Sequence, residues 1–266
     1  AKYIPQSLSL GNKGILPAFS NNKRSLTYGV YPQTHISDLL TISKLNVLTN
    51  KNEQGYYELD GDYYVLLDSI PNAVNAGNAF SDGTIIRTET RYWFKCEPIE
   101  WNILENYNGD YFLKSKRILD VQSYNDFFED DDVNKITCNN YALSNIRSWL
   151  NNEFYDHAFL NDDSLIQTTY VSNVSNMYKY TVESTEDKIF LLGEKEFVDT
   201  KYGFINDEGD ELKIAEPTDY ALALGVRTFA ISLYGKDGHF YNYGAYYWTR
   251  QTCEFVLVID CLCLTK

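Results

Sequence analysis

The chain has 266 residues, enough for one large domain or two ordinary ones with a substantial core. Hydrophobic residues make up 44% of it and aromatic residues 15%, including 23 tyrosines, so the composition is that of a folded protein. The chain has 23 lysines and arginines and 37 aspartates and glutamates, so its formal net charge is 23 − 37 = −14. This negative charge argues against binding to nucleic acid or anionic membranes.

Residues 1–25 are rich in turn formers, and we expect them to be loosely ordered ahead of a single domain at residues 26–266. The chain starts at Ala1 and its only methionine is Met177, which indicates a processed or trimmed N-terminus compatible with a removed export signal. The most apolar run, residues 255–264, is interrupted by Asp260 and falls short of the ~20 residues that span a bilayer. We therefore expect no membrane insertion.

The first half of the domain is predicted to form mainly strands. Residues 28–32 are strand-like, and residues 37–45 predict a short helix that is capped by Ser37 and has an apolar side. Residues 57–67 and 105–115 each place a turn dipeptide, Asp-Gly or Asn-Gly, between apolar runs, so both predict β-hairpins. Between them, residues 92–104 predict two strand segments that are broken at Pro98.

The second half carries the main helix. Apolar residues at helical spacing predict this helix within residues 140–159, with Ser144 or Asn140 as its cap. Residues 189–192 predict a buried strand, and residues 217–225 a short helix that ends at Gly225. With neither βαβ alternation nor a glycine-rich phosphate loop, the sequence predicts an α+β domain with largely antiparallel strands, one main helix and one or two short helices.

Several phrases, in order along the chain, resemble a bacterial family known as domain of unknown function 6273. They lie at residues 28–33, 97–101, 144–151, 190–196, 215–221 and 247–250. The resemblance implies a C-type-lectin-like fold, shared with formylglycine-generating enzymes, and an exported or surface location on a bacterium. The chain departs from the family after Arg250, where residues 251–260 replace the usual Ser/Gly-rich loop and the Arg-Pro near the end.

Residues 241–250 hold five aromatic side chains and one guanidinium, and they are the candidate ligand-binding stretch. On a strand, Tyr246, Trp248 and Arg250 would share one face, and Trp248 is the expected core member. Aromatic rings with a guanidinium suit sugar- or protein-binding surfaces, although core packing accounts for at least half of the stretch. The candidate ligand-binding residues are Tyr241, Tyr243, Tyr247 and Arg250.

No sequence pattern identifies a catalytic site or a cofactor. His35, His157 and His239 are isolated in sequence, and neither a nucleophile elbow, HExxH nor a Walker loop occurs. The acidic runs at 126–132 and 206–211 supply oxygen ligands of the kind that Ca²⁺ takes, but neither follows the EF-hand pattern. We expect no resident metal, with Ca²⁺ as the alternative.

Five cysteines do not form a disulfide framework, and the expected role is that of small buried hydrophobic residues. They are Cys96, Cys138, Cys253, Cys261 and Cys263. Formylglycine-generating enzymes hold copper with a C-terminal cysteine pair, but Cys261 and Cys263 are more tightly spaced, so copper is not expected.

The sequence thus predicts a noncatalytic recognition module of an exported or surface bacterial protein, with a carbohydrate or a protein as its ligand. Two alternatives stay open. One is an enzyme, of formylglycine-generating kind or a hydrolase with dispersed residues. The other is a structural module of a larger surface protein.

Overall fold

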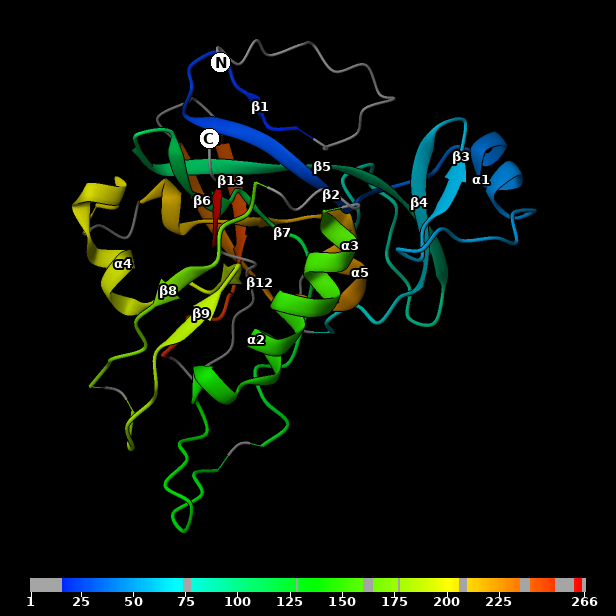
Figure 1. The fold of residues 1–266 in the computed structure, drawn as a ribbon. Coiled ribbons are helices and arrows are strands. Elements are labelled where there is room, and N and C mark those ends of the chain that lie inside the picture. Colours follow the sequence, from blue (N-terminus) through cyan, green and yellow to red (C-terminus); the bar gives the residue numbers. More distant parts are fainter. Residues whose placement is uncertain are drawn as a thin grey trace.

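The computed structural model describes residues 16–73, 78–127, 129–159, 165–176, 178–205, 210–234, 240–251 and 261–264. Over these residues the chain is an α+β protein with short helices and mostly antiparallel strands, as the sequence predicts (Figure 1). The α-helices are α1 (Leu39–Leu45), α2 (Asn145–Trp149), α3 (Tyr155–Ala158), α4 (Glu194–Val198) and α5 (Asp219–Leu224).

Eight of the strands form one sheet, in the order β1-β2-β5-β6-β14-β10, with β4 and β3 branching from β5. They are β1 (Ala18–Phe19), β2 (Ser25–His35), β3 (Tyr57–Leu59), β4 (Asp62–Asp68), β5 (Arg91–Tyr107), β6 (Asp110–Ser115), β10 (Ile189–Phe190) and β14 (Cys261–Leu264). Three two-stranded sheets contain the others, which are β7 (Arg117–Ile118) with β11 (Glu216–Pro217), β8 (Thr169–Val171) with β9 (Thr185–Asp187), and β12 (Thr228–Tyr234) with β13 (Phe240–Ala245). The C-terminal part of the expected loose segment includes β1, which pairs with β2, while residues 1–15 lie outside the described residues.

Strand β5 is continuous through Pro98, so the expected break at this proline is wrong. Pro98 pairs with Val30 of β2, and the register of β2 shifts next to this pair, between Thr27 and Val30. A bulge there accommodates a residue that lacks an N–H donor. The Gln33 side chain adds hydrogen bonds to the carbonyl oxygens of Glu97 and Pro98, at 2.9 and 3.1 Å.

Both predicted hairpins are present. The turn between β3 and β4 is made by Asp60 and Gly61, and the turn between β5 and β6 by Asn108 and Gly109. All four residues have positive φ, which is the geometry of the tight turns that these dipeptides favour.

The predicted main helix is divided into several turns. A 3-10 turn (η2, Tyr141–Leu143) comes first, Ser144 caps α2 by accepting from the Arg147 N–H, and a π-helical turn (η3, Leu150–Phe154) separates α2 from α3. Helix α5 has the predicted start and end, with Thr218 as its N-cap and Gly225 at φ +98° after it. Helix α1 is capped by Asp38 and not by Ser37.

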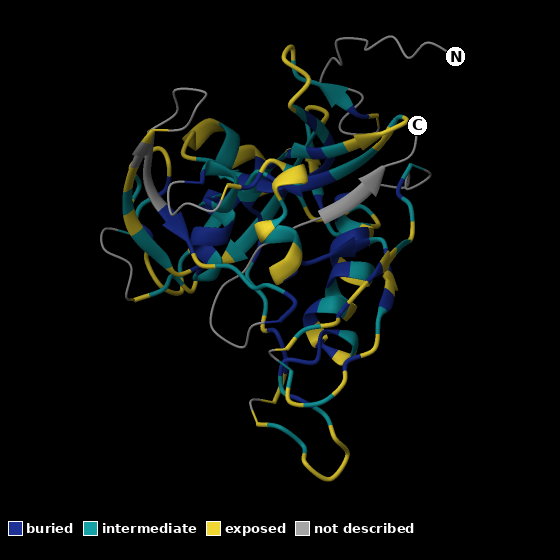
Figure 2. Cartoon of the chain, turned by 90° about the vertical axis from the view of Figure 1, so that its left-hand side faces the viewer, coloured by how far each residue is buried: buried dark blue, intermediate teal, exposed yellow. Residues whose placement is uncertain are grey.

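The main core joins residues of the sheet to residues of the α2–α3 segment. Figure 2 shows the buried stretches of the chain in dark blue. Trp101 and Tyr28 are fully buried in the main core, and the Trp101 indole donates to the Tyr28 carbonyl oxygen at 2.8 Å. Helix α1, β3 and β4 form a lobe to one side of this body, on the right in Figure 1. The lobe has a small core of its own around Leu45, Tyr64 and Trp93.

Candidate functional site

Arg250, one of the four candidate ligand-binding residues, lies in the interior with only 1% of its surface exposed. Its guanidinium pairs with Glu196 at 2.7 Å and donates to the carbonyl oxygens of Leu191 at 2.6 Å and Ser172 at 3.3 Å. The Arg250 carbonyl oxygen in turn accepts from the Tyr178 hydroxyl at 2.6 Å. Arg250 therefore connects α4 to the segments around Leu191 and Ser172 through internal contacts. Its guanidinium is not part of a surface.

Tyr247 is half-buried and tied to the body. Its hydroxyl donates to the Lys213 carbonyl oxygen at 2.8 Å, and its ring stacks on Phe197 with centroids 5.5 Å apart. Tyr241 and Tyr243 lie in β13, but their side chains are outside the described part of the structure. The four candidates therefore do not share one described surface.

Strand β13 ends at Ala245, so the strand alternation expected for residues 246–250 is wrong. Trp248 packs against the main core, as expected, but Tyr246 is exposed. Its ring lies edge-on to Phe229 at 4.9 Å, and the Arg227 guanidinium carbon is 5.2 Å from its centroid. We call Arg227, Phe229 and Tyr246 the ribbon cluster. It is an aromatic and cationic surface that the sequence analysis did not identify.

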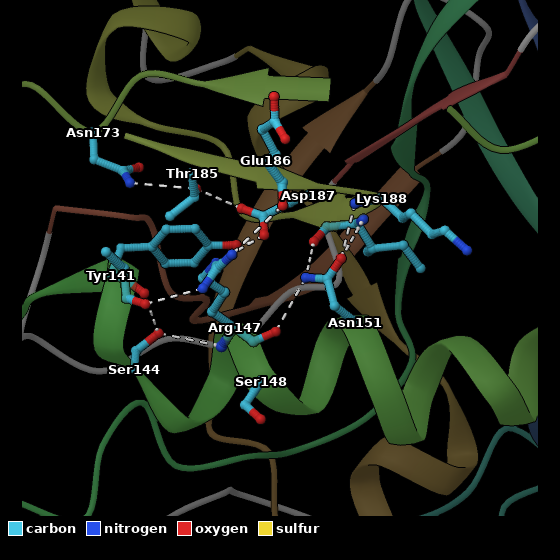
Figure 3. Close-up of polar contacts among 12 residues, drawn as sticks. Tyr141, Ser144, Arg147, Ser148, Asn151, Asn173, Thr185, Glu186, Asp187 and Lys188 are labelled. Carbon is cyan, nitrogen blue, oxygen red and sulfur yellow. Dashed lines mark hydrogen bonds and ion pairs between the residues drawn. The ribbon is translucent and has the colours of Figure 1, made fainter. Parts of the chain in front are cut away.

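The phrase at residues 144–151 forms a polar framework between α2 and β9 (Figure 3). Arg147 pairs with the buried Asp187 at 2.7 Å, and the Thr185 hydroxyl donates to the same carboxylate at 2.6 Å. The Asn151 side-chain oxygen accepts from the backbone N–H groups of Lys188 and Ile189. These contacts are all internal, so this phrase holds the fold together.

Other phrases of the resemblance have the same role. Asp219 of α5 is buried and accepts from the His35 N–H at 3.0 Å and from the Ser81 N–H at 2.7 Å. Gly193 begins α4, and a Cβ there would lie 2.5 Å from the Arg250 guanidinium. A binding site is therefore to be sought away from these internal contacts.

A cavity of about 360 Å³ lies in the lobe, between α1 and the strands β4 and β5. This lobe cavity has aliphatic walls, aromatic rings and a few polar groups. It is lined by His35, Ile36, Ile42, Leu45, Asn46, Leu48, Tyr57, Leu66, Arg91, Tyr92 and Trp93. Its volume falls within the usual range for small-ligand sites.

His35 is one of the residues that line the lobe cavity, and its side chain is buried against Phe80, Tyr92 and Phe94. Its Nδ1 lies 2.9 Å from Asp82 Oδ2, and its ring stacks on Phe80 with centroids 4.3 Å apart. Burial raises the pKa of the Asp82 carboxyl, but hydrogen bonds from Thr84, His35 and Ser37 outweigh it and hold that pKa below the ordinary value. His35 and Asp82 are separated by 47 positions, so no local pattern could have revealed the pair.

The described residues contain no group of three or more histidine, cysteine, aspartate or glutamate side chains arranged to hold a metal ion. In the loop after β7, which projects from the body in Figure 1, Asp132 pairs with Lys179 at 2.7 Å and Asp130 accepts from the Cys138 N–H at 2.8 Å. The second acidic run lies mostly outside the described residues, as does His239.

Two of the cysteines, Cys96 and Cys138, are free thiols. Cys261 and Cys263 lie in β14, as expected of a strand, while Cys253 is outside the described residues.

No helix in the described ranges is long and apolar enough to cross a membrane. Neither a curated protein nor a solved structure matches the chain. A family model does match it, over residues 108–257, and its description is "Domain of unknown function (DUF6273)". That match spans more than half of the 266 residues and includes the phrases at 144–151, 190–196, 215–221 and 247–250. The chain therefore belongs to the family of domain of unknown function DUF6273.

Proposed function

We propose that this chain is a noncatalytic recognition module, that the lobe is its binding surface, and that a protein is its ligand. The proposal includes a C-type-lectin-like arrangement and an exported or surface location on a bacterium, which the family resemblance implies. The lobe lies before residue 108 and so outside the family match, which suits a region that adapts to a particular ligand.

The observation that carries the proposal is the outer side of α1 beside the lobe cavity. Leu39 and Leu40 of α1 are 79% and 67% exposed, and Val47, just after the helix, is 76% exposed, whereas Ile42 and Leu45 of α1 line the cavity. Leu39 and Ile42 are neighbours on the helix surface because they are three residues apart. Adjacent exposed apolar side chains rimming a cavity are typical of protein interaction sites.

The chemistry of the cavity supports recognition rather than catalysis. Among the described residues, its lining includes neither serine, threonine, cysteine, aspartate nor glutamate, the side chains that most often act as nucleophiles. The net charge of −14 favours association with a basic protein segment.

A carbohydrate is the second candidate ligand, and the ribbon cluster favours it. Tyr246 is 37% exposed beside the Arg227 guanidinium, and Phe229 packs over Gly244, where a Cβ would meet its ring at 2.8 Å. A rigid ring with an adjacent cation offers stacking and hydrogen bonding to a sugar.

Selection from a displayed peptide library, with a glycan array in parallel, tests both candidates. We expect the wild-type chain to enrich basic peptides with apolar anchors, and Leu39→Ser with Leu40→Ser to weaken binding of a selected peptide at least about tenfold. Tyr246→Ala is the matched control for the peptide arm and the test variant for the glycan arm. If the Leu39→Ser, Leu40→Ser protein binds the selected peptides as wild type does, the lobe is not the protein-binding surface.

A further inference from the structure

The turn of the β5–β6 hairpin contains the only Asn-Gly dipeptide of the chain, Asn108-Gly109. Tyr107 pairs with Asp110, so Asn108 and Gly109 form the whole turn, and their φ angles are +54° and +100°. Asn108 is exposed, and Tyr107 beside it is 70% exposed. Solvent therefore reaches both the Asn108 side-chain amide and the peptide bond that follows it.

An exposed Asn-Gly dipeptide has a reaction of its own, because glycine has no side chain to shield the next backbone nitrogen. After solvent base removes the N–H proton, the Gly109 nitrogen bonds to Asn108 Cγ, and the bond from Cγ to the side-chain nitrogen breaks. That nitrogen takes a proton from solvent and leaves as ammonia, and a cyclic succinimide remains. A water molecule then opens the ring at either carbonyl, which gives aspartate or isoaspartate.

The side chain of Asn106 holds the nitrogen that has to attack. The Gly109 N–H donates a hydrogen bond to Asn106 Oδ1 at 3.0 Å. An amide oxygen is too weak a base to take the proton, so the hydrogen bond has to break before solvent base can remove it. The free energy of this bond therefore adds to the barrier of ring closure.

We propose that Asn108 is a site of spontaneous deamidation and that the Asn106 side chain slows the reaction by holding the Gly109 N–H. The inference goes beyond the recognition function and depends on no ligand. Deamidation replaces a neutral amide by a carboxylate, and isoaspartate also adds a methylene to the main chain of a tight turn. Since β6 follows this turn and contributes the buried Leu113 to the main core, the isoaspartate form should melt at a lower temperature than the original chain.

Incubation of the full chain at neutral pH, followed by peptide mapping with mass spectrometry, measures the conversion of Asn108. Asn106→Leu keeps the shape of the side chain but lacks the acceptor, and we expect conversion about fivefold faster than in wild type, the equivalent of one neutral hydrogen bond. Asn106→Asp keeps an acceptor oxygen and should stay within about twofold of wild type. Asn134 is the internal control, since it is exposed but followed by Lys135, and it should convert more slowly than Asn108 in every sample.

Amide hydrogen exchange in the wild-type chain tests the hydrogen bond without a variant. We expect the Gly109 N–H to exchange at least about fivefold more slowly than in a synthetic peptide of residues 105–111. In Asn106→Leu this protection should disappear, while Leu113 of β6 should keep its own protection and so report that the hairpin is still formed.

Equal conversion rates of Asn108 in wild type and Asn106→Leu overturn the proposal, as does an Asn106→Asp variant that converts as fast as Asn106→Leu. Absence of conversion in Asn106→Leu counts equally against it, and so does a Gly109 N–H that exchanges as fast as in the peptide. The proposed function is tested separately, by the peptide and glycan selections.

Discussion

The Tyr31 hydroxyl donates a hydrogen bond to Asp120 Oδ2 over 2.6 Å, and both side chains are buried. Burial raises the pKa of Asp120 to about 6, against the opposing hydrogen bonds from Tyr31, Gln122 and the Val121 N–H. Because the folded state holds this proton more tightly than the unfolded state does, the stabilisation is complete below about pH 4 and is lost as the pH rises through about 6.

Asp120→Asn should remove this pH dependence. The free energy of unfolding of the variant, relative to wild type, should rise by roughly 2–3 kcal/mol between pH 4 and pH 7. Urea denaturation at the two pH values measures it, with the exposed Asp110→Asn as the control. An equal difference between variant and wild type at both pH values would show that Asp120 does not titrate in this range.

Removing either side of the Arg250–Glu196 pair should destabilise the protein strongly. Glu196→Gln leaves a guanidinium that is 1% exposed without its carboxylate, and we expect a loss of roughly 3 kcal/mol. Lys44→Met is the matched control, because its ion pair with Asp60 is exposed, and the loss should stay under about 1 kcal/mol. Denaturant midpoints compare the two, and similar small losses would contradict the assigned role of Arg250.

Gly225→Ala should cost more than Gly83→Ala, although both glycines have positive φ, +98° and +86°. A Cβ at Gly225 would lie 2.6 Å from the Ile70 carbonyl oxygen, whereas a Cβ at Gly83 meets nothing within 4 Å. The backbone penalty of about 1 kcal/mol is common to both variants, so the difference in melting temperature isolates the clash. Equal losses would place Ile70 farther from α5.

Asp219→Ala should destabilise the fold. Its carboxylate holds the His35 N–H at 3.0 Å and the Ser81 hydroxyl at 2.8 Å, and Ser81 adjoins Asp82. We expect a stability loss of roughly 2–3 kcal/mol, since buried donors lose their acceptor. Asp38→Ala, which removes the exposed cap of α1, is the control and should cost less stability; urea denaturation compares the two variants. Equal losses in the two variants would contradict the buried role of the Asp219 carboxylate.

Elements whose turns or ends are set by neighbouring residues could be predicted from the sequence. The Asp60-Gly61 and Asn108-Gly109 turns, and the Thr218 and Gly225 ends of α5, depend on residues next to one another in sequence. The continuity of β5 could not be predicted, because a bulge on the neighbouring strand accommodates Pro98. Whether a proline interrupts a strand therefore depends on contacts with residues that are distant in sequence.

The candidate site was harder to predict than the fold. Aromatic density drew attention to residues 241–250, but Arg250 is used internally, and its burial follows from Glu196 and Leu191, which are more than 50 positions away. The lobe cavity needs α1, β4 and β5 together, and nothing in the spacing of its residues indicates that they meet. Composition pointed to aromatic side chains and a guanidinium, but it could not show that the Arg250 guanidinium is buried.

Strand β5 runs without interruption from the lobe into the body. At Lys95 it is paired on both edges, with Thr34 of β2 and with Tyr64 of β4, and farther along it pairs with β6. A strand hydrogen-bonded on both sides resists hinge bending, so the lobe moves with the body as one piece. Substitutions on the outer side of α1 can therefore change ligand preference while the shared framework keeps the orientation of the cavity constant.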